Sequence, residues 1–126
     1  MMELTIDGKV FEFNFGMGFL REINKKTAVP VDGLPDVKKN IGFSYYLAGV
    51  LSGDVEFLVD VLDMANKGRK ARVTRALLDS YIDDADTDID ALFDTVIDFL
   101  KQSNATKKVT LDTIAEVEKE KANIRV

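Results

Sequence analysis

One uncharged segment, residues 37–52, most constrains how this chain can fold. After Lys39 it holds no charged side chain, and its apolar residues do not confine themselves to one face of a helix. A helix that is apolar all round is typical of a protein interior, where neighbours cover it on several sides. The segment is also shorter than the ~20 residues that a membrane-spanning helix needs. We therefore predict a buried central helix over residues 37–52 and no membrane span.

Two glycines in this segment indicate close packing. Gly42 and Gly49 are seven residues apart, so they share a face of the helix. Each glycine costs a helix roughly 0.8–1 kcal/mol relative to alanine, and packing against a neighbouring backbone has to offset that cost. We expect Asp36 to cap the start of the helix and Gly53 to cap its end.

The composition excludes several classes of enzyme. The 126 residues suffice for one domain, and 46% of them are hydrophobic, which is enough for a core. The chain has no cysteine and no histidine, so thiolate zinc sites and Cys-His or Ser-His-Asp mechanisms are excluded. The net charge of −5 disfavours nucleic-acid binding by phosphate neutralisation. The first residues show no signal peptide, so we expect a cytoplasmic protein, and one without a cofactor.

Residues 3–15 have the pattern of a β-hairpin. Apolar and polar residues alternate along them, and Asp7-Gly8 is a dipeptide that suits a tight two-residue turn. A hairpin alone is only marginally stable in water, so its apolar face needs a cover. A ligand groove is the alternative use of that face. The returning strand places three aromatic residues there: Phe11, Phe13 and Phe15.

Amphipathic patterns predict further helices after the hairpin. The clearest has apolar residues at i, i+3, i+4, i+7, i+8 and i+11 in the segment that ends at Ser103. Both prolines of the chain lie in residues 27–36, which we expect to be a loop. Apart from the central helix, the expected helices span residues 18–26, 54–66, 74–83 and 87–103.

Together these patterns predict an α+β fold that is mostly α-helical. An N-terminal β-hairpin packs on a bundle of about five helices, and residues 1–104 form a single globular domain. Residues 105–126 follow as a tail, in which Leu111, Ile114 and Val117 are spaced three apart among charged residues. The tail is either a loosely docked helix or a flexible segment that becomes helical on a partner. We expect its deletion to leave the fold intact and to weaken partner binding.

Charged residues form two neighbouring runs of opposite sign. A phosphate-binding patch is one interpretation of the basic run, but no aromatic residue is interleaved with it and the whole chain is acidic. A protein-protein contact, pairing with the acidic run over residues 79–98, or head-to-tail self-association fits these charges better. The candidate partner-binding residues are the basic run and the apolar residues of the tail: Lys67, Arg69, Lys70, Arg72, Arg75, Leu111, Ile114 and Val117.

Neither ligand motif that the chain suggests is complete. Residues 84–90 alternate aspartate with other residues, as a calcium loop does, but positions six and twelve hold Ile89 and Thr95 in place of glycine and glutamate. Residues 16–21 lack the third glycine of a phosphate-binding loop. We interpret the acidic run as the start of a helix, where negative charge suits the helix dipole, and we expect no metal site.

Several short motifs stand in a characteristic order along the chain. A short strand leads to a Gly8-Lys9 turn, an aromatic strand, and a glycine followed by Phe-Leu-Arg-Glu-Ile at residues 19–23. This order resembles the tail assembly chaperones of long-tailed phages that infect Gram-positive bacteria. The resemblance covers about residues 3–106. Its later segments are residues 81–84, 88–94 and 100–106.

The resemblance implies a non-enzymatic assembly factor. Such a chaperone binds the tape measure protein, a long and largely helical chain, keeps it soluble, and helps to recruit the major tail protein. It acts in the host bacterial cytoplasm and leaves before the virion is complete. Because the chain is acidic and its apolar segment short, we expect neither nucleic acid nor a membrane among its partners.

Two other classes of protein fit parts of the sequence. A small acidic adaptor or regulatory protein, of the anti-repressor or anti-sigma kind, would share the acidic helical body. A pull-down that recovered polymerase would favour that class. A divalent-metal enzyme would use the aspartates of residues 84–90, although the sequence supplies no positioned nucleophile or base. A titration with magnesium and calcium that produced no heat would exclude such an enzyme.

Overall fold

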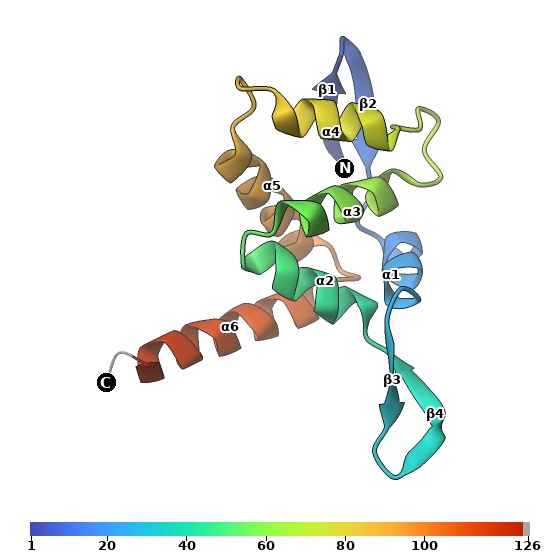
Figure 1. Cartoon of the computed structure of the whole chain (residues 1–126), viewed down its shortest axis with the longest axis vertical. Coiled ribbons are helices and arrows are strands. Elements are labelled where there is room, and N and C mark those ends of the chain that lie inside the picture. Colours follow the sequence, from blue (N-terminus) through green and yellow to red (C-terminus); the bar gives the residue numbers. More distant parts are fainter. Residues whose placement is uncertain (125–126) are drawn as a thin grey trace.

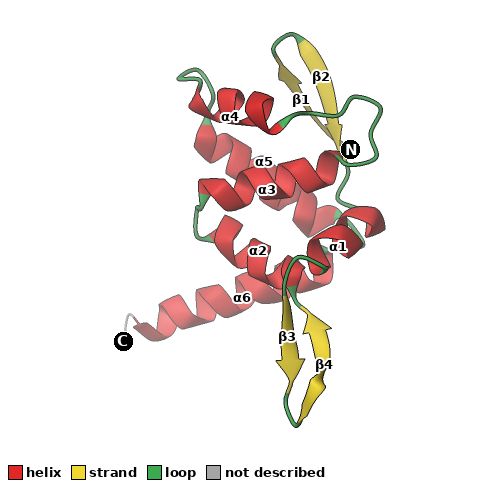
Figure 2. Ribbon diagram, turned by 45° about the vertical axis from the view of Figure 1, so that its right-hand side comes forward, coloured by secondary structure: helices red, strands yellow, loops and turns green. Residues whose placement is uncertain are grey.

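The computed structural model describes residues 1–124. In this range it has two β-hairpins and six α-helices (Figures 1 and 2). The predicted α+β class, mostly helical with an N-terminal hairpin, is confirmed. The elements in chain order are β1 (Met2–Ile6), β2 (Lys9–Phe13), α1 (Met17–Asn24), β3 (Ala28–Val31), β4 (Leu34–Asn40), α2 (Gly42–Leu51), α3 (Val55–Asn66), α4 (Arg75–Asp83), α5 (Ile89–Gln102) and α6 (Lys107–Ile124).

The N-terminal hairpin forms as predicted, and its aromatic face is buried. Strands β1 and β2 are antiparallel, and the turn residues Asp7 and Gly8 both have a positive φ, 53° and 75°. A positive φ at both central residues is the requirement of a type I′ turn. Phe11, Phe13 and Phe15 are buried, because β1 packs against α4 and β2 against α3. The rings therefore belong to the core.

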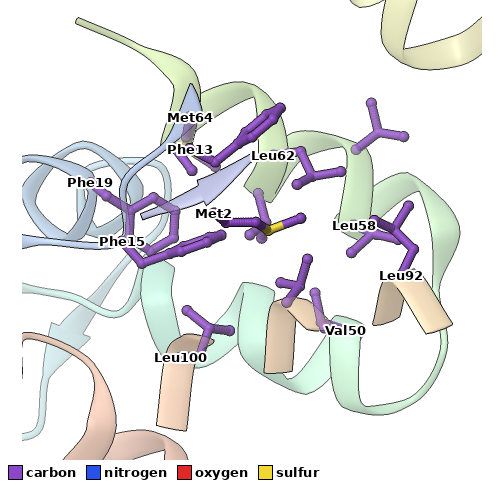
Figure 3. Close-up of a cluster of buried hydrophobic side chains, with 14 of the residues drawn as sticks. Met2, Phe13, Phe15, Phe19, Val50, Leu58, Leu62, Met64, Leu92 and Leu100 are labelled. Carbon is purple, nitrogen blue, oxygen red and sulfur yellow. The ribbon is translucent and has the colours of Figure 1, made fainter. Parts of the chain in front are cut away.

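The core brings together side chains from elements far apart in the sequence. Figure 3 shows side chains of β1, β2, α1, α2, α3 and α5 that converge between the hairpin and the helices. Helix α2 lies at the centre, in contact with α1, α3, α5 and α6. This confirms the central position predicted for it, although Ser44, Tyr45 and Ala48 on its outer side are exposed.

Both glycines of α2 permit close contacts. A side-chain carbon at Gly42 would collide with the backbone carbonyl of Ile23 at the end of α1. One at Gly49 would collide with the ring of Phe57 in α3. The prediction of close packing is confirmed, but the two glycines meet different neighbours, and only Gly42 meets a backbone.

The segment with both prolines is a second hairpin, so the predicted loop over residues 27–36 is wrong. Strand β3 pairs antiparallel with β4, and Gly33 makes the turn with a φ of +77°. Strand β3 holds two valines and β4 holds one, and β-branched residues favour an extended backbone. Proline is tolerated because both strands of a two-stranded sheet are edge strands, whose outer N–H positions need no partner.

The central helix begins later than predicted, and Asp36 is not its N-cap. Strand β4 takes the chain as far as Asn40, and α2 starts at Gly42. The side chain of Asn24, from the end of α1, accepts a hydrogen bond from the Phe43 amide at 3.0 Å. A residue from another helix thus satisfies one of the free N–H groups at this helix start.

The other helix boundaries follow local capping signals. Asp54, Thr74 and Asp88 each accept hydrogen bonds from backbone amides in the first turn of α3, α4 and α5. Gly53 follows α2 in the left-handed conformation, with a φ of 84°, and so ends the helix as predicted. These boundaries agree with the predicted ones to within about two residues.

Helix α6 begins inside the packed body and then leaves it. Thr106 and Thr110 are buried, and α6 contacts α2 and α5. The Thr106 hydroxyl donates to the carbonyl of Leu100 at 2.7 Å. Beyond this contact, α6 extends away from the other helices (Figures 1 and 2). Of the segment expected as a tail, residues 107–124 form one long helix whose first turn packs against the body, and residues 125–126 lie outside the described residues.

Candidate protein-interaction surfaces

The basic run lies on the connection between α3 and α4, and part of it pairs within the molecule. Arg72 Nη2 lies 2.9 Å from Asp63 Oδ1, and Arg75 Nη1 lies 2.6 Å from Asp60 Oδ1. The hydrogen bond to Asp60 raises the pKa of Arg75 above its ordinary value, so this guanidinium stays charged.

The acidic partners of the basic run precede it in the chain. Asp60 and Asp63 belong to α3, and Lys67 pairs with Glu22 of α1 at 3.7 Å. Within residues 1–124, no ion pair joins the basic run to the acidic run over residues 79–98. Such pairing was one of the expectations, and for the described residues it is wrong. The reason is geometric, because α3 lies alongside the connection that carries the arginines.

The remaining two basic residues differ in exposure. Arg69 is half-buried, and its Nη1 donates to the sulfur of Met1 at 3.7 Å. Lys70 is exposed. Four of the five residues are exposed, and three of these four, Lys67, Arg72 and Arg75, pair with carboxylates. Lys70 is the exposed member of the run that forms no ion pair within residues 1–124.

Asn66 organises this connection, and the sequence analysis missed it. Its side chain is fully buried. The amide nitrogen donates to the carbonyls of Glu12 and Ala71, at 2.9 and 3.0 Å. The amide oxygen accepts from Arg72 Nη1 at 2.9 Å and from the Val73 amide at 2.7 Å. These four bonds satisfy the side chain completely and join β2, α3 and the basic run.

The apolar candidates of the tail lie on α6, in another part of the molecule. Leu111 is 49% exposed, and Val109, which the sequence analysis did not select, is 40% exposed. Ile114 and Val117 are half-buried. The basic run lies near the N-terminal hairpin, whereas α6 leaves the molecule elsewhere (Figures 1 and 2). The structure therefore does not join the two groups of candidate residues into one site.

The hairpin of β3 and β4 is a further exposed surface that the sequence analysis missed. Within residues 1–124 each strand pairs only with the other, and the hairpin projects from the body (Figure 2). Val29, Leu34 and Val37 are all more than one-third exposed. Asp32-Gly33 between two valine-containing stretches is the sequence signal for this hairpin, and the two prolines are a local signal against it.

The acidic residues at the start of α5 have structural roles. The Asp84 carboxylate accepts a hydrogen bond from the Asp86 amide at 2.9 Å, and Asp88 accepts one from the Ala91 amide at 3.0 Å. In the part of the chain that the structure describes, no three carboxylates gather as a metal site would require. The reading of these residues as the acidic start of a helix is supported by their hydrogen bonds.

No helix within residues 1–124 combines the length and the apolar character needed to cross a bilayer.

These surfaces suit binding to other proteins, and comparison with known families agrees. The family model described as phage tail assembly chaperone protein, TAC, matches residues 3–122. The chain belongs to the phage tail assembly chaperone family. The match runs beyond residue 106, where the resemblance in the sequence ended, and takes in most of α6. No curated protein and no solved structure matches the chain.

Membership of this family assigns the chain to the assembly of phage tails inside a host cell. It is a family of chaperones and not of enzymes. Exposed apolar side chains lie on α6 and on the β3–β4 hairpin, and contiguous exposed apolar surface is typical of protein-protein contacts.

Proposed function

We propose that this tail assembly chaperone binds the tape measure protein in the host bacterial cytoplasm and keeps it soluble. It then helps to recruit the major tail protein, and it leaves before the virion is complete. Family membership supports the assembly role. The observation that carries the choice of partner is α6, which extends away from the other helices (Figure 1) and exposes the apolar side chains of Val109 and Leu111 near its start.

The geometry of α6 fits contact with another helix. Leu111, Ile114 and Val117 recur every three residues along one side of α6, and Val109 is exposed on a different side, because residues two apart on a helix do not face each other. Helices associate through side chains at such spacing. A long helical chain that exposes apolar side chains would therefore find a matching surface along α6, and covering both surfaces would keep them from aggregating.

The basic run supplies the second part of the proposed contact. Its members are Lys67, Arg69, Lys70, Arg72 and Arg75. The side chains of Asn66 and Asp63 hold Arg72, Asp60 holds Arg75, and Glu22 of α1 pairs with Lys67. Ion pairs at a surface contribute about 0–1 kcal/mol each, so a partner with acidic side chains can compete for these cations. We assign to this run an effect on the rate and selectivity of association, and to α6 most of the affinity.

Co-expression with the tape measure protein of the same phage tests the proposal. We expect the full chain to keep that protein in the soluble fraction and to co-purify with it. The double variant V109S/L111S should retain the fold, because both side chains are largely exposed, but recover at least about five-fold less partner.

A matched control separates this surface from apolar exposure in general. Val10 and Met17 are 50% and 48% exposed on other elements, and V10S/M17S should co-purify with the tape measure protein as the unaltered chain does. An insoluble tape measure protein in the presence of the unaltered chain would overturn the proposal. Recovery of polymerase in its place would support the regulatory adaptor.

A further inference from the structure

Helices α3 and α4 enclose a groove on the outer surface of the molecule. The two helices run antiparallel, so the start of α3 faces the end of α4 (Figure 1). The groove has a volume of about 510 Å³. On α3 its lining residues are spaced i, i+1, i+4 and i+5, and on α4 they are spaced i, i+4, i+7 and i+8. One continuous face of each helix therefore lines it: Val55, Glu56, Val59 and Asp60 from α3, and Arg75, Asp79, Ile82 and Asp83 from α4.

The groove has an apolar strip between polar sides. Val55, Val59 and Ile82 form the strip, with Val59 buried and the other two half-buried. Each half-buried side chain keeps apolar surface that a partner can cover, at a gain of about 25 cal/mol per Å². An apolar strip bounded by charged side chains is the form of a groove that receives one face of an amphipathic helix.

The charged side chains along the groove are mostly negative, and only one carboxylate among them is in an ion pair. Arg75 at one end is bound to Asp60. Towards the other end Glu56, Asp79 and Asp83 are exposed, and within residues 1–124 none of them forms an ion pair. Four carboxylates against one guanidinium leave an excess of three negative charges. The sign excludes a phosphate-bearing ligand and favours a basic one.

We propose that the groove between α3 and α4 binds a basic amphipathic helix of a partner protein. Apolar side chains of that helix at i, i+3 or i+4, and i+7 cover Val55, Val59 and Ile82, and lysines or arginines beside them pair with the three exposed carboxylates. The inference rests on the proposed function, since it names the kind of segment in a helical partner that this chaperone holds. The α6 surface and the groove are then two separate contacts on one partner chain.

A peptide probe tests the groove directly. The probe is a labelled synthetic helix of about five turns, with leucines along one face and lysines on both sides of that face. A second peptide has the same composition in shuffled order. By fluorescence anisotropy with the full chain, we expect the ordered peptide to bind at least ten-fold more tightly than the shuffled one, and its affinity to fall as salt rises.

Charge-neutralising variants show whether binding occurs in the groove. E56Q/D79N/D83N should bind the ordered peptide about ten-fold more weakly. The control D90N/D94N/D98N removes the same number of charges from the exposed stripe of α5 and should bind within about two-fold of the unaltered chain. The inference would be overturned if both variants lost peptide affinity equally, or if E56Q/D79N/D83N lost none. All six residues are exposed, and the unfolding midpoint verifies that each variant is folded.

The same variants distinguish the two proposals in co-expression with the tape measure protein. If the unaltered chain keeps that protein soluble and the groove variant does so equally well, the groove inference fails and the proposed function stands. If the unaltered chain does not keep it soluble, the proposed function fails, and the groove inference fails with it. If the unaltered chain keeps the tape measure protein soluble and the groove variant does not, the result supports both the proposed function and the groove inference.

Discussion

A single buried side chain, Asn66, connects the N-terminal hairpin to the candidate basic surface. Replacing it with alanine removes four hydrogen bonds, and it leaves the buried amide of Val73 and the part-buried carbonyls of Glu12 and Ala71 without that partner. We expect Asn66→Ala to lower the free energy of unfolding by about 2–4 kcal/mol. Denaturant unfolding measures this loss. Asn104→Ala, at an exposed turn, should stay within about 0.5 kcal/mol of the unaltered chain.

Gly42 marks the closest approach between two helices. An alanine there would place its methyl group against the carbonyl of Ile23, and a backbone carbonyl cannot move without shifting α1. We expect Gly42→Ala to destabilise the fold by about 3 kcal/mol or more. Gly18 in α1 has open space around it, so Gly18→Ala should stabilise by about 0.5–1 kcal/mol. Equal thermal midpoints for the two variants would contradict this account of the packing.

At the scale of elements, α6 divides into a packed first turn and a projecting remainder. Deleting residues 116–126 removes no buried side chain among the described residues, so the unfolding midpoint should stay unchanged while binding of the tape measure protein weakens. Deleting residues 105–126 also removes the buried Thr106 and Thr110. We still expect cooperative unfolding of residues 1–104, at a lower midpoint. Calorimetry of the two truncations measures both effects, and loss of a cooperative transition in the longer deletion would place α6 within the folding unit.

The β3–β4 hairpin exposes apolar side chains that do not pack into the core. Unpaired strand edges and apolar side chains favour association with another strand, and we propose a second copy of this chain as one occupant. Replacing Val29, Leu34 and Val37 with threonine places a β-branched residue at each position, which suits a strand. It also reduces the apolar surface that the hairpin exposes. We expect the triple variant to self-associate less in sedimentation velocity experiments. Its unfolding midpoint should stay unchanged, since the hairpin packs outside the core.

At the scale of the whole molecule, several charged side chains serve the fold itself. The carboxylates at the start of α5 are used as a cap and a turn, and those of α3 hold arginines. We therefore expect magnesium and calcium to produce no binding heat and no rise in the unfolding midpoint, because a ligand stabilises only what it binds. A saturable heat, or turnover of a small molecule by the purified chain, would contradict the proposal that the protein is not an enzyme.

Features that depend on a few neighbouring residues were readable from the sequence. The Asp7-Gly8 turn, the Gly53 cap at the end of α2 and the amphipathic stripe of α5 all appear where they were predicted. The second hairpin could not be read from the sequence in this way, because the prolines and valines in residues 27–40 give opposing local signals. Only its antiparallel pairing, Ala28 opposite Asn40, decides between them.

The sequence by itself determined the helical class, the aromatic core of the first hairpin and the membership of an assembly family. The tertiary structure alone decided where the surfaces lie. It brought Asn24 to the start of α2, Asn66 to the strand β2, and the acidic faces of α3 and α4 to the two sides of one groove. The physical reason is the separation of the contacting residues along the chain. Turns and caps depend on residues two to four positions apart, whereas these contacts join residues that are far apart and leave no periodic pattern in the sequence.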